Sequence, residues 1–595
     1  MCQNELTPEI LKLDFIDFDR EFGDFLLRFT RKELPELAVA GMLTAYELRS
    51  GNPILDLTGY AGKTIALDDE KKILLPNAAS WKETLLQSQA AALPDSDLRT
   101  PLLFTGEYLL MLRRYAGYAN NVRQKLFALR RYNRELQMPD VANSDLDLLQ
   151  HLAVFSGVNS RLLILSGGPG TGKTTVCGHI IRNRLAQNPD MKILFAAPTG
   201  KAQQNLAGQI RAAGSDLPES SLLRQAIERV KGATLHSFVL NPQWRTELEY
   251  CDLLIIDECS MISLEMFSKL LDILPPATSL ILAGDRRQLT SIESGSVFSD
   301  LCSFGKVNQL PEFAADFLQS NSDIAVEFTG KEDDFSGHIV ELQRNFRSAS
   351  APSICRIAAM LRENSLPDET LSAMISATQE EDFRFRTVAN SELDSALRER
   401  CADLKNLPQL CRSKDPAQFA QALKIVESSK FICTVNQGDR GTAEINNWML
   451  KELNILPTRT GEWLPGTVLL VTANDRQSGL RNGDIGIVTL EQLSSEMPSQ
   501  RFVRFVSCPE KRFPLSEVPS HECGFAISVH RAQGSGYAKV TFLLPGYKSK
   551  VLCRELLYTG ITRAATSIEL WGPPEEVLFA LTHSKERSSN LFKHT

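Results

Sequence analysis

Residues 167–174 read Gly-Gly-Pro-Gly-Thr-Gly-Lys-Thr and match the phosphate-binding pattern GxxxxGK[ST]. An apolar, β-prone run at 162–165 precedes this loop, and residues 175–185 have a helix-forming composition. A strand, loop and helix in this order let backbone N–H groups converge on an anion at the positive end of the helix. The alternative is a glycine-rich turn. We predict a nucleotide site, with Lys173 at the β and γ phosphates and Thr174 holding Mg²⁺.

The region from about 145 to 305 alternates short apolar runs with helical stretches. Such alternation predicts a parallel sheet covered by helices on both faces. The expected strands are 162–165, 193–197, 253–257 and 279–283. The acidic segment 311–337, which contains Glu332, Asp333 and Asp334, is predicted to be a solvated, loop-like connection.

A second series of apolar runs predicts a second α/β domain. The expected strands are 430–435, 467–472, 525–529, 539–544 and 567–571. Within this region, glycines punctuate short β-rich runs over 460–522, which favours a small inserted β-barrel or sandwich. Residues 1–125 are expected to be mainly helical, with helical apolar spacing in 37–48 and 108–118.

Composition limits the class of protein. A chain of 595 residues should form several domains, and 43% hydrophobic with 23% charged residues is typical of a soluble protein with a buried core. No run of about 18 uncharged apolar residues appears, so we expect a cytoplasmic protein with no membrane partner. The 12 cysteines include no CxxC pair, which argues against a zinc ribbon, an iron–sulfur cluster or a disulfide scaffold. The net charge of −7 does not favour nucleic acid, although a local basic groove is compatible with it.

Polar residues follow two of the predicted strands. Asp257 and Glu258 end the run Leu253–Ile256, and Gln288 lies just after the strand at 279–283. The carboxyl ends of parallel strands share one edge of a sheet, so these side chains should meet the phosphate loop there. Asp257 would hold Mg²⁺, Glu258 would activate the attacking water, and Gln288 would sense the γ-phosphate. The alternatives are acidic and hydrophilic turns at the strand ends.

The chain carries an ordered series of motifs that resembles the motif series of superfamily 1 helicases. Within that superfamily it is most similar to the RecD family, the alpha subunits of exodeoxyribonuclease V. Gln150 matches the adenine-reading glutamine of the family, and Asn482–Gly486 resembles the turn of its SH3-like insertion. The matching segments are 167–174, 197–202, 234–236, 257–262, 284–289, 342–347, 529–535 and 558–564.

The resemblance implies an α/β fold with two RecA-like P-loop motor domains built on parallel sheets. A mainly helical N-terminal domain at 1–125 would contact a partner. The first motor domain would span 126–335 and the second 336–595, with the SH3-like insertion at about 460–522. Because only about 166 residues precede Gly167, the chain is more similar to subunits borne by a complex than to stand-alone relatives.

The resemblance also assigns roles to residues. Arg347 and Arg563 would approach the γ-phosphate from the second motor domain, since a guanidinium stabilises phosphoryl oxygens. The catalytic set is Lys173, Asp257, Glu258, Gln288, Arg347 and Arg563. ATP would contact Gln150, Gly167, Gly168, Pro169, Gly170, Thr171, Gly172, Lys173, Thr174 and Thr175, with Mg²⁺ at Thr174 and Asp257. DNA would contact Pro198, Thr199, Lys201, Thr234, His236 and His530. Taken alone, the two histidines are more often ordinary packed or surface residues.

The implied function is that of an ATP-dependent 5′-to-3′ DNA helicase and translocase. It would bind single-stranded DNA at duplex ends and assemble with RecB and RecC homologues in a heterotrimer that unwinds and processes broken ends for recombinational repair. Two departures from the family pattern stand out: Gly536 replaces a glutamate of the motif at 533–536, and only 237–250 is left for a strand-splitting pin. The alternatives are an ATP-binding structural subunit with a weakened motor, and a stand-alone helicase or a nuclease.

Overall fold

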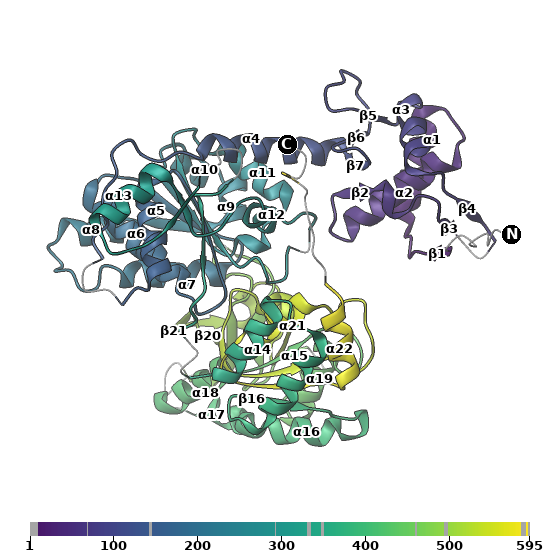
Figure 1. The fold of residues 1–595 in the computed structure, drawn as a ribbon. Helices are drawn as coiled ribbons and strands as arrows, with labels where there is room; N and C mark the ends of the chain where they lie inside the picture. The colour runs from purple at the N-terminus through teal and green to yellow at the C-terminus, as the bar shows by residue number, and fades with distance from the viewer. Residues whose placement is uncertain are drawn as a thin grey trace.

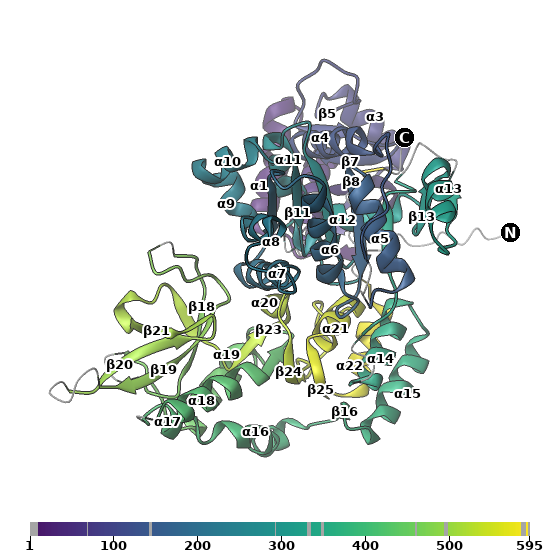
Figure 2. The same ribbon diagram turned by 90° about the vertical axis from the view of Figure 1, so that its left-hand side faces the viewer.

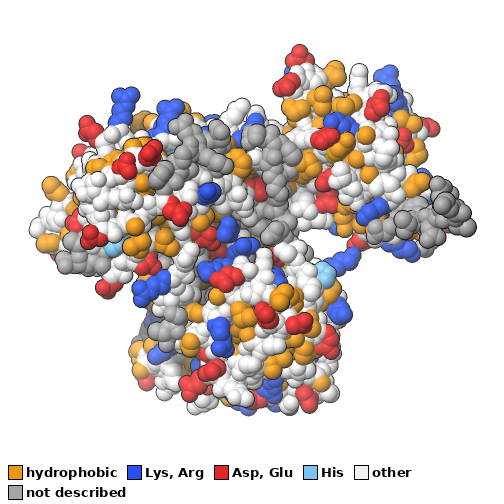
Figure 3. Space-filling view, in the orientation of Figure 1, with side chains coloured by type: hydrophobic (Ala, Val, Ile, Leu, Met, Phe, Trp, Pro, Cys, Tyr) orange, Lys and Arg blue, Asp and Glu red, His pale blue; other side chains and the backbone are white. Residues whose placement is uncertain are grey.

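The computed structural model describes most of the chain. The described residues are 10–67, 70–141, 145–291, 293–329, 335–346, 350–413, 415–458, 461–475, 477–492, 498–584 and 591–592. Figure 1 shows two lobes, each built around one sheet, with the N-terminal region beside the first lobe. On the face in Figure 3, acidic and basic side chains are interspersed, so the net charge of −7 is not gathered in one patch there.

The first sheet has six parallel strands in the order β10-β9-β11-β12-β8-β15. These strands are β8 (Leu162–Gly167), β9 (Ile193–Ala197), β10 (Lys231–Thr234), β11 (Leu253–Ile256), β12 (Ser279–Gly284) and β15 (Ile339–Leu342). Every residue of β8, β9 and β11 is buried, as expected for strands covered on both faces. The four strands predicted in this region are therefore present, and β10 and β15 are additional.

Helices cover both faces of this sheet (Figure 2). One face carries α5 (Leu148–Asn159), α6 (Lys173–Gln187), α7 (Gly200–Ala212), α8 (Leu222–Glu228) and α13 (Glu312–Asn321). The other carries α4 (Arg113–Leu129), α9 (Leu235–Leu240), α11 (Leu264–Ile273) and α12 (Val297–Ser303), with α10 (Pro242–Glu249) nearby. Because all six strands are parallel, their carboxyl ends lie along one edge of the sheet.

Two expectations for this region were wrong. The segment 311–337 is not a solvated loop, because α13 forms there and buries Ala314, Ala315 and Leu318; its acidic residues masked an amphipathic pattern. The short pair β13 (Gln309–Pro311) and β14 (Glu327–Thr329) flanks it. Glu332, Asp333 and Asp334 lie outside the described residues. The predicted boundary between the two motor domains, at 335, also lies too early in the chain, because β15 pairs with β8 in the first sheet.

The N-terminal region contains helices and two small sheets. Its helices are α1 (Asp17–Thr30), α2 (Pro35–Arg49) and α3 (Ala78–Gln87). The strands are β1 (Ile10–Lys12), β2 (Ile54–Asp56), β3 (Thr64–Ala66), β4 (Lys72–Leu74), β5 (Ala91–Ala92), β6 (Leu102–Phe104) and β7 (Leu109–Leu112). The helix expected over 108–118 is therefore partly strand, because 109–112 pairs with β2 and β6. Helix α4 runs on from β7 and packs along α11 of the first lobe, where Asn121 Nδ2 donates to Ser268 Oγ at 2.9 Å.

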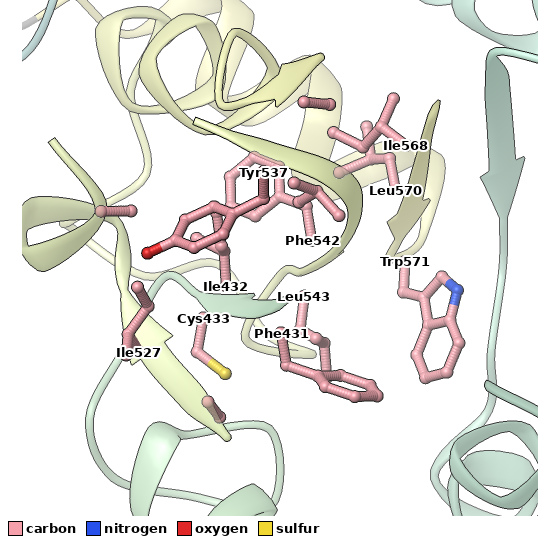
Figure 4. Packing of buried hydrophobic residues seen from close by; sticks show 14 of the residues in the cluster. Phe431, Ile432, Cys433, Ile527, Tyr537, Phe542, Leu543, Ile568, Leu570 and Trp571 are labelled. Carbon is pink, nitrogen blue, oxygen red and sulfur yellow. The ribbon is translucent and has the colours of Figure 1, made fainter. Parts of the chain in front are cut away.

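The second lobe has a parallel sheet in the order β16-β25-β24-β17-β23. Its strands are β16 (Phe383–Arg386), β17 (Ser429–Cys433), β23 (Ala526–Ser528), β24 (Tyr537–Leu543) and β25 (Ala564–Trp571). Phe431, Phe542 and Trp571 are fully or almost fully buried in its core (Figure 4). The surrounding helices are α14 (Pro352–Arg362), α15 (Pro367–Ser376), α16 (Leu393–Arg400), α17 (Leu407–Leu410), α18 (Pro416–Ser428), α19 (Thr442–Glu452), α20 (Val529–Ala532), α21 (Arg554–Ile561) and α22 (Pro574–Thr582).

A separate antiparallel sheet lies between β17 and β23 in the chain. Its order is β21-β20-β19-β18-β22. The strands are β18 (Val468–Val471), β19 (Ile485–Glu491), β20 (Gln500–Phe505), β21 (Cys508–Pro514) and β22 (His521–Cys523). They enclose a small core of their own around Leu469, Val488 and Phe505. This sheet extends to one side of the second lobe (Figure 2).

Residues 591–592 lie against the first lobe, although α22 belongs to the second. Phe592 is 3% exposed and its ring packs 4.9 Å from that of Phe304 and 5.2 Å from that of Phe335. Phe127 of α4 completes this aromatic cluster. The C-terminal residues therefore contribute to the core of a domain formed much earlier in the chain.

We predict that Phe592→Ala destabilises the first lobe by about 3–5 kcal/mol, because it removes a buried aromatic side chain from that cluster. Urea unfolding followed by domain-specific fluorescence or amide exchange measures the change. Phe18→Ala is the matched control, since Phe18 is 63% exposed and should cost little. Equal effects of the two substitutions would contradict this assignment.

Lys430 is a buried cation in β17 of the second lobe. It is 2% exposed, its Nζ donates to the Gly524 carbonyl at 2.9 Å, and it lies 5.7 Å from the Tyr537 ring centroid. Burial lowers the pKa of Lys430 to about 7, and the nearby Lys201 adds to this effect. In an unfolded chain the pKa of lysine is about 10.4. Between these two pKa values the unfolded chain binds more protons than the folded chain, so the free energy of unfolding should rise with pH.

We predict that Lys430→Met removes this rise. Between pH 7 and pH 9 the wild-type chain should gain about 2 kcal/mol relative to the variant, close to the limit for one proton over that interval. Urea unfolding of both proteins at the two pH values is the measurement. Lys424→Met is the control. Lys424 lies at an exposed position of α18, so this substitution should leave the pH dependence of the free energy of unfolding as in the wild type. If the free energies of unfolding of the wild type and of Lys430→Met change identically with pH, titration of Lys430 in this range is ruled out.

Candidate nucleotide and DNA site

The loop between β8 and α6 has the backbone geometry of an anion-binding loop. Gly170 and Gly172 have φ of 82° and 85°, a region that glycine enters without strain. A Cβ on Gly172 would overlap the side-chain amide of Gln150. Lys173 begins α6, and its Nζ donates to the carbonyls of Gly167 at 2.6 Å and Gly168 at 3.1 Å. The ammonium group is thus held at the loop, beside the positive end of a 15-residue helix.

Gln150 is placed beneath this loop. Its backbone N–H donates to Asp147 Oδ1 and its Oε1 accepts from the Asp147 N–H, which together cap α5. Its Nε2 donates to the Thr171 carbonyl at 3.0 Å. Gln150 is 2% exposed, and its predicted role in reading adenine stays a prediction.

A cavity of about 380 Å³ lies beside the loop, between the two lobes. Both lobes contribute polar groups to its wall. From the first lobe come Pro169, Gly170, Gly172, Lys173, Thr174, Thr175, Ala202, Asn205, Gln209, Asp257, Glu258 and Gln288. From the second come Gly534, Ser535, Gly536, Thr562 and Arg563. Five of the six residues in the predicted catalytic set therefore meet in one cavity, and the sixth, Arg347, lies outside the described residues.

Asp257 and Glu258 line this cavity at the end of β11, and both are partly exposed. Burial raises the pKa of Asp257, although the Lys173 ammonium works against the rise. Burial also raises the pKa of Glu258, and the neighbouring Asp257 raises it further, whereas Arg563 and Lys173 lower it. Glu258 adopts φ 54°, a left-handed conformation that is uncommon for glutamate. The Glu258 N–H donates to Asp257 Oδ1 at 2.8 Å, so this turn also orients Asp257.

Gln288 and Arg563 approach the cavity from opposite lobes. Gln288 is 2% exposed, and its Oε1 has no hydrogen-bond partner within the described part of the chain. Arg563 is 3% exposed, with Nε donating to the Thr559 carbonyl at 3.0 Å and Nη1 to the Ser535 carbonyl at 3.2 Å. Cross-lobe hydrogen bonds hold this arrangement: Leu289 N–H donates to Thr559 Oγ1 at 2.9 Å, and Gln533 Nε2 donates to the Leu289 carbonyl at 2.9 Å.

Sequence reasoning missed the contribution of Asn345 and Phe346. Asn345 Nδ2 donates to the Pro169 carbonyl at 3.1 Å, and the Phe346 N–H donates to the Gly170 carbonyl at 3.0 Å. The Phe346 ring is partly exposed next to Gly172. Both residues directly precede Arg347, so the motif at 342–347 located them without indicating that they bind the loop.

The predicted DNA contacts follow the carboxyl ends of three strands, namely β9, β10 and β23. Pro198 and Thr199 come after β9, and the Thr199 hydroxyl caps α7 by accepting from the Ala202 N–H. Thr234 is buried and its hydroxyl bonds Ser237, whereas His236 is exposed. His530 in α20 is partly exposed. Lys201 is largely covered: burial lowers its pKa, and its Nζ lies 5.0 Å from the Tyr537 ring centroid. His236 is therefore the most accessible residue of the six.

Three family models match separate parts of the chain. Residues 15–109 match the N-terminal domain of RecBCD enzyme subunit RecD. Residues 150–294 match an AAA domain, and residues 524–569 match a UvrD-like helicase C-terminal domain. The matches thus fall on the N-terminal region and on both lobes that line the cavity.

Curated relatives extend the similarity over most of the chain. A protein of Mycolicibacterium smegmatis named RecBCD enzyme subunit RecD is 29% identical over 585 residues, covering 94% of this chain and 93% of the relative. The chain is thus similar to RecD proteins over most of its length. The Haemophilus influenzae protein of the same name is 29% identical over 474 residues, which cover 75% of this chain and 72% of the relative.

More remote similarities also occur. The ATP-dependent RecD2 DNA helicase of Deinococcus radiodurans is 23% identical over 73% of this chain and 50% of its own length. Among solved structures, Pif1 helicases in a study of forked duplex DNA unwinding align over 71% of this chain and 91% of theirs, with 17% identity and a TM-score of 0.40. No helix among the described residues is long and apolar enough to cross a membrane.

We predict that Gly172→Ala weakens nucleotide binding at least about tenfold, because the new methyl group displaces Gln150 and the positive φ adds strain. Titration with a fluorescent ATP analogue measures the affinity. Gly208→Ala in α7 is the matched control, since a Cβ there meets nothing within 4 Å and should leave binding unchanged. Unaltered affinity of Gly172→Ala would show that this loop geometry is not needed for binding.

Proposed function

We propose that this chain is the ATP-dependent 5′-to-3′ DNA helicase and translocase subunit of a RecBCD-type assembly. The observation that carries the proposal is the cavity of about 380 Å³ in which Lys173, Asp257 and Glu258 of one lobe face Arg563 of the other. A phosphoryl-transfer site requires cations on the phosphate, a carboxylate for a metal and a base for water. The two lobes supply these groups jointly, so binding and hydrolysis of ATP would change the contact between them.

Each group has a proposed role. The Gly167–Gly172 backbone and Lys173 bind the β and γ phosphates of ATP. The Thr174 hydroxyl and the Asp257 carboxylate suit Mg²⁺, which prefers oxygen ligands and would neutralise phosphate charge. Glu258 orients the attacking water and accepts its proton, and its raised pKa moves it toward the working pH of a general base. Arg563, and Arg347 by resemblance, stabilise charge on the transferred phosphoryl group.

DNA would be held near the edge where β9, β10 and β23 end. Thr199, Lys201, Thr234 and His236 from one lobe and His530 from the other are the proposed contacts, with Pro198 shaping the path. Contacts to the phosphate backbone position a strand without reading its sequence, which suits a translocating motor. Alternating closure and opening of the ATP cavity would advance the two lobes along the strand.

The N-terminal region is the proposed partner contact. Helix α1 presents a row of phenylalanines at helical spacing, of which Phe18, Phe25 and Phe29 are 63%, 39% and 45% exposed. An apolar row of this kind favours burial against another protein. RecB and RecC homologues are the proposed partners, on the basis of the family. The same similarity to RecD proteins supports action on duplex DNA ends and recombinational repair.

One specific observation favours a second function. Gly536 lines the cavity at the place where the family motif has a glutamate, so the second lobe has one carboxylate fewer there. An ATP-binding subunit with a weakened motor is therefore the second candidate. Measurement of DNA-stimulated turnover separates the two candidates.

We predict that Lys173→Ala abolishes DNA-stimulated ATP hydrolysis, lowering turnover at least about 100-fold while the fold is retained. Phosphate release with single-stranded DNA, measured on the chain alone and with its partners, is the assay, and circular dichroism checks the fold. Lys192→Ala is the control, because Lys192 lies beyond α6 and pairs with Glu247 rather than with the loop. Near-normal turnover of Lys173→Ala would contradict the motor assignment.

We also predict strand polarity. Duplexes with only a 5′ single-stranded tail should be unwound, and duplexes with only a 3′ tail should not, in an assay with ATP and Mg²⁺. A strict preference for 3′ tails would contradict the proposed direction.

A further inference from the structure

Tyr558 connects the two lobes at a point that adjoins the ATP cavity. It belongs to α21 of the second lobe, and its hydroxyl donates to Asp285 Oδ2 of the first lobe at 2.8 Å. Asp285 follows β12 and is 2% exposed, while Tyr558 is 3% exposed. A buried hydrogen bond from a phenol to a carboxylate is charge-assisted and geometrically demanding. Its location makes it sensitive to the separation of the lobes.

The same carboxylate organises Gln288. Gln288 Nε2 donates to Asp285 Oδ2 at 3.3 Å, so Tyr558 and Gln288 share one acceptor oxygen. Asp285 Oδ1 accepts from the Arg287 N–H at 3.0 Å, and the Asp285 carbonyl accepts from the Gln288 N–H at 3.2 Å. The side chain and the backbone of Gln288 are thus both held by Asp285. The amide oxygen of Gln288 has no partner in the described chain, and Gln288 lines the cavity.

Tyr558 also lies next to the phosphate-binding loop. A Cβ on Gly168 would lie 2.9 Å from the Tyr558 hydroxyl, so the absence of a side chain there lets the phenol approach. Gly168 in turn accepts a hydrogen bond from Lys173. One hydroxyl of the second lobe therefore bonds the carboxylate that holds Gln288 and lies close to the loop.

We propose that Tyr558 is a positioning residue that sets the orientation of Gln288 through Asp285 when the two lobes are closed. The role of Gln288 at the γ-phosphate rests on the proposed function, whereas the positioning rests on the contacts above. Closure brings the phenol to Oδ2 and fixes the carboxylate. Opening withdraws it and leaves Asp285 free to turn, so Gln288 loses its fixed direction. The phenol is a donor throughout, because burial and the adjacent Asp285 raise the pKa of Tyr558 well above its usual value.

Tyr558→Phe keeps the ring and removes only the hydroxyl. We expect kcat for DNA-stimulated ATP hydrolysis to fall about tenfold or more, since small errors of placement are costly in catalysis, with the KM for ATP changed less than about twofold. A double-mutant cycle tests whether Tyr558 acts through Gln288. In the Gln288→Ala background, Tyr558→Phe should lower kcat by less than about a further twofold. If the double variant instead loses kcat by the product of the two single losses, the inference is overturned.

Thr559→Val is the matched control. It removes another hydrogen bond between the same two lobes, that of Leu289 N–H to Thr559 Oγ1, which does not involve the Gln288 side chain. In the double variant with Gln288→Ala, the loss of kcat should equal the product of the two single losses. If Thr559→Val and Tyr558→Phe behave alike in the cycle, Tyr558 serves only as a contact between lobes and the inference fails.

A readout that does not depend on turnover separates this inference from the proposed function. Amide exchange of the segment 285–289 in the nucleotide-free full chain should be faster in Tyr558→Phe, because the hydrogen bonds of Asp285 to Arg287 and Gln288 loosen. Unchanged exchange would overturn the positioning role even in an active motor. A wild-type complex without ATP turnover would instead contradict the proposed function, and the exchange result would still decide the role of Tyr558.

Discussion

The electrostatic balance inside the cavity between the lobes governs the rest of the structure. Two carboxylates, Asp257 and Glu258, are held where burial disfavours their charge, and Lys173 and Arg563 are the cations that offset this cost. Lys173 comes from the loop of the first lobe and Arg563 from the second, so neither lobe balances the site alone. The charge distribution therefore makes hydrolysis chemistry depend on how the lobes meet.

Neutral hydrogen bonds surround that charged centre and hold the two lobes in the observed arrangement. Leu289 bonds Thr559 and Gln533 across the cleft, and Asn345 and Phe346 hold the carbonyls of the phosphate-binding loop. These bonds are short-range and directional, so a small rotation of one lobe breaks several of them together. In this arrangement Tyr558 would connect the position of the second lobe to the orientation of Gln288. Coupling between nucleotide state and DNA grip needs a two-state element of this kind.

Most of the fold was predictable because its strands have strong local signals. The runs at 162–165, 193–197, 253–257 and 279–283 are apolar and short, and all four are strands of the first sheet. Predictions failed where the local signal was weak or misleading. β10 contains Lys231 and Gly232 and is not apolar enough to be recognised, and α13 combines acidic residues with an apolar face. β15 lies far along the chain from β8, so only tertiary pairing places it in the first sheet.

The sequence by itself determined the chemical groups of the site, because a phosphate loop and carboxylates at strand ends are local patterns imposed by the chemistry of nucleotides. It also indicated that the second lobe supplies an arginine. Only the tertiary structure decided which contacts surround those groups: Gln150 Nε2 donates to the Thr171 carbonyl, the Lys201 ammonium lies over the Tyr537 ring, and Tyr558 reaches Asp285. The last two contacts join residues far apart in the chain. Burial and hydrogen-bond geometry between distant segments follow from packing, which no local pattern records.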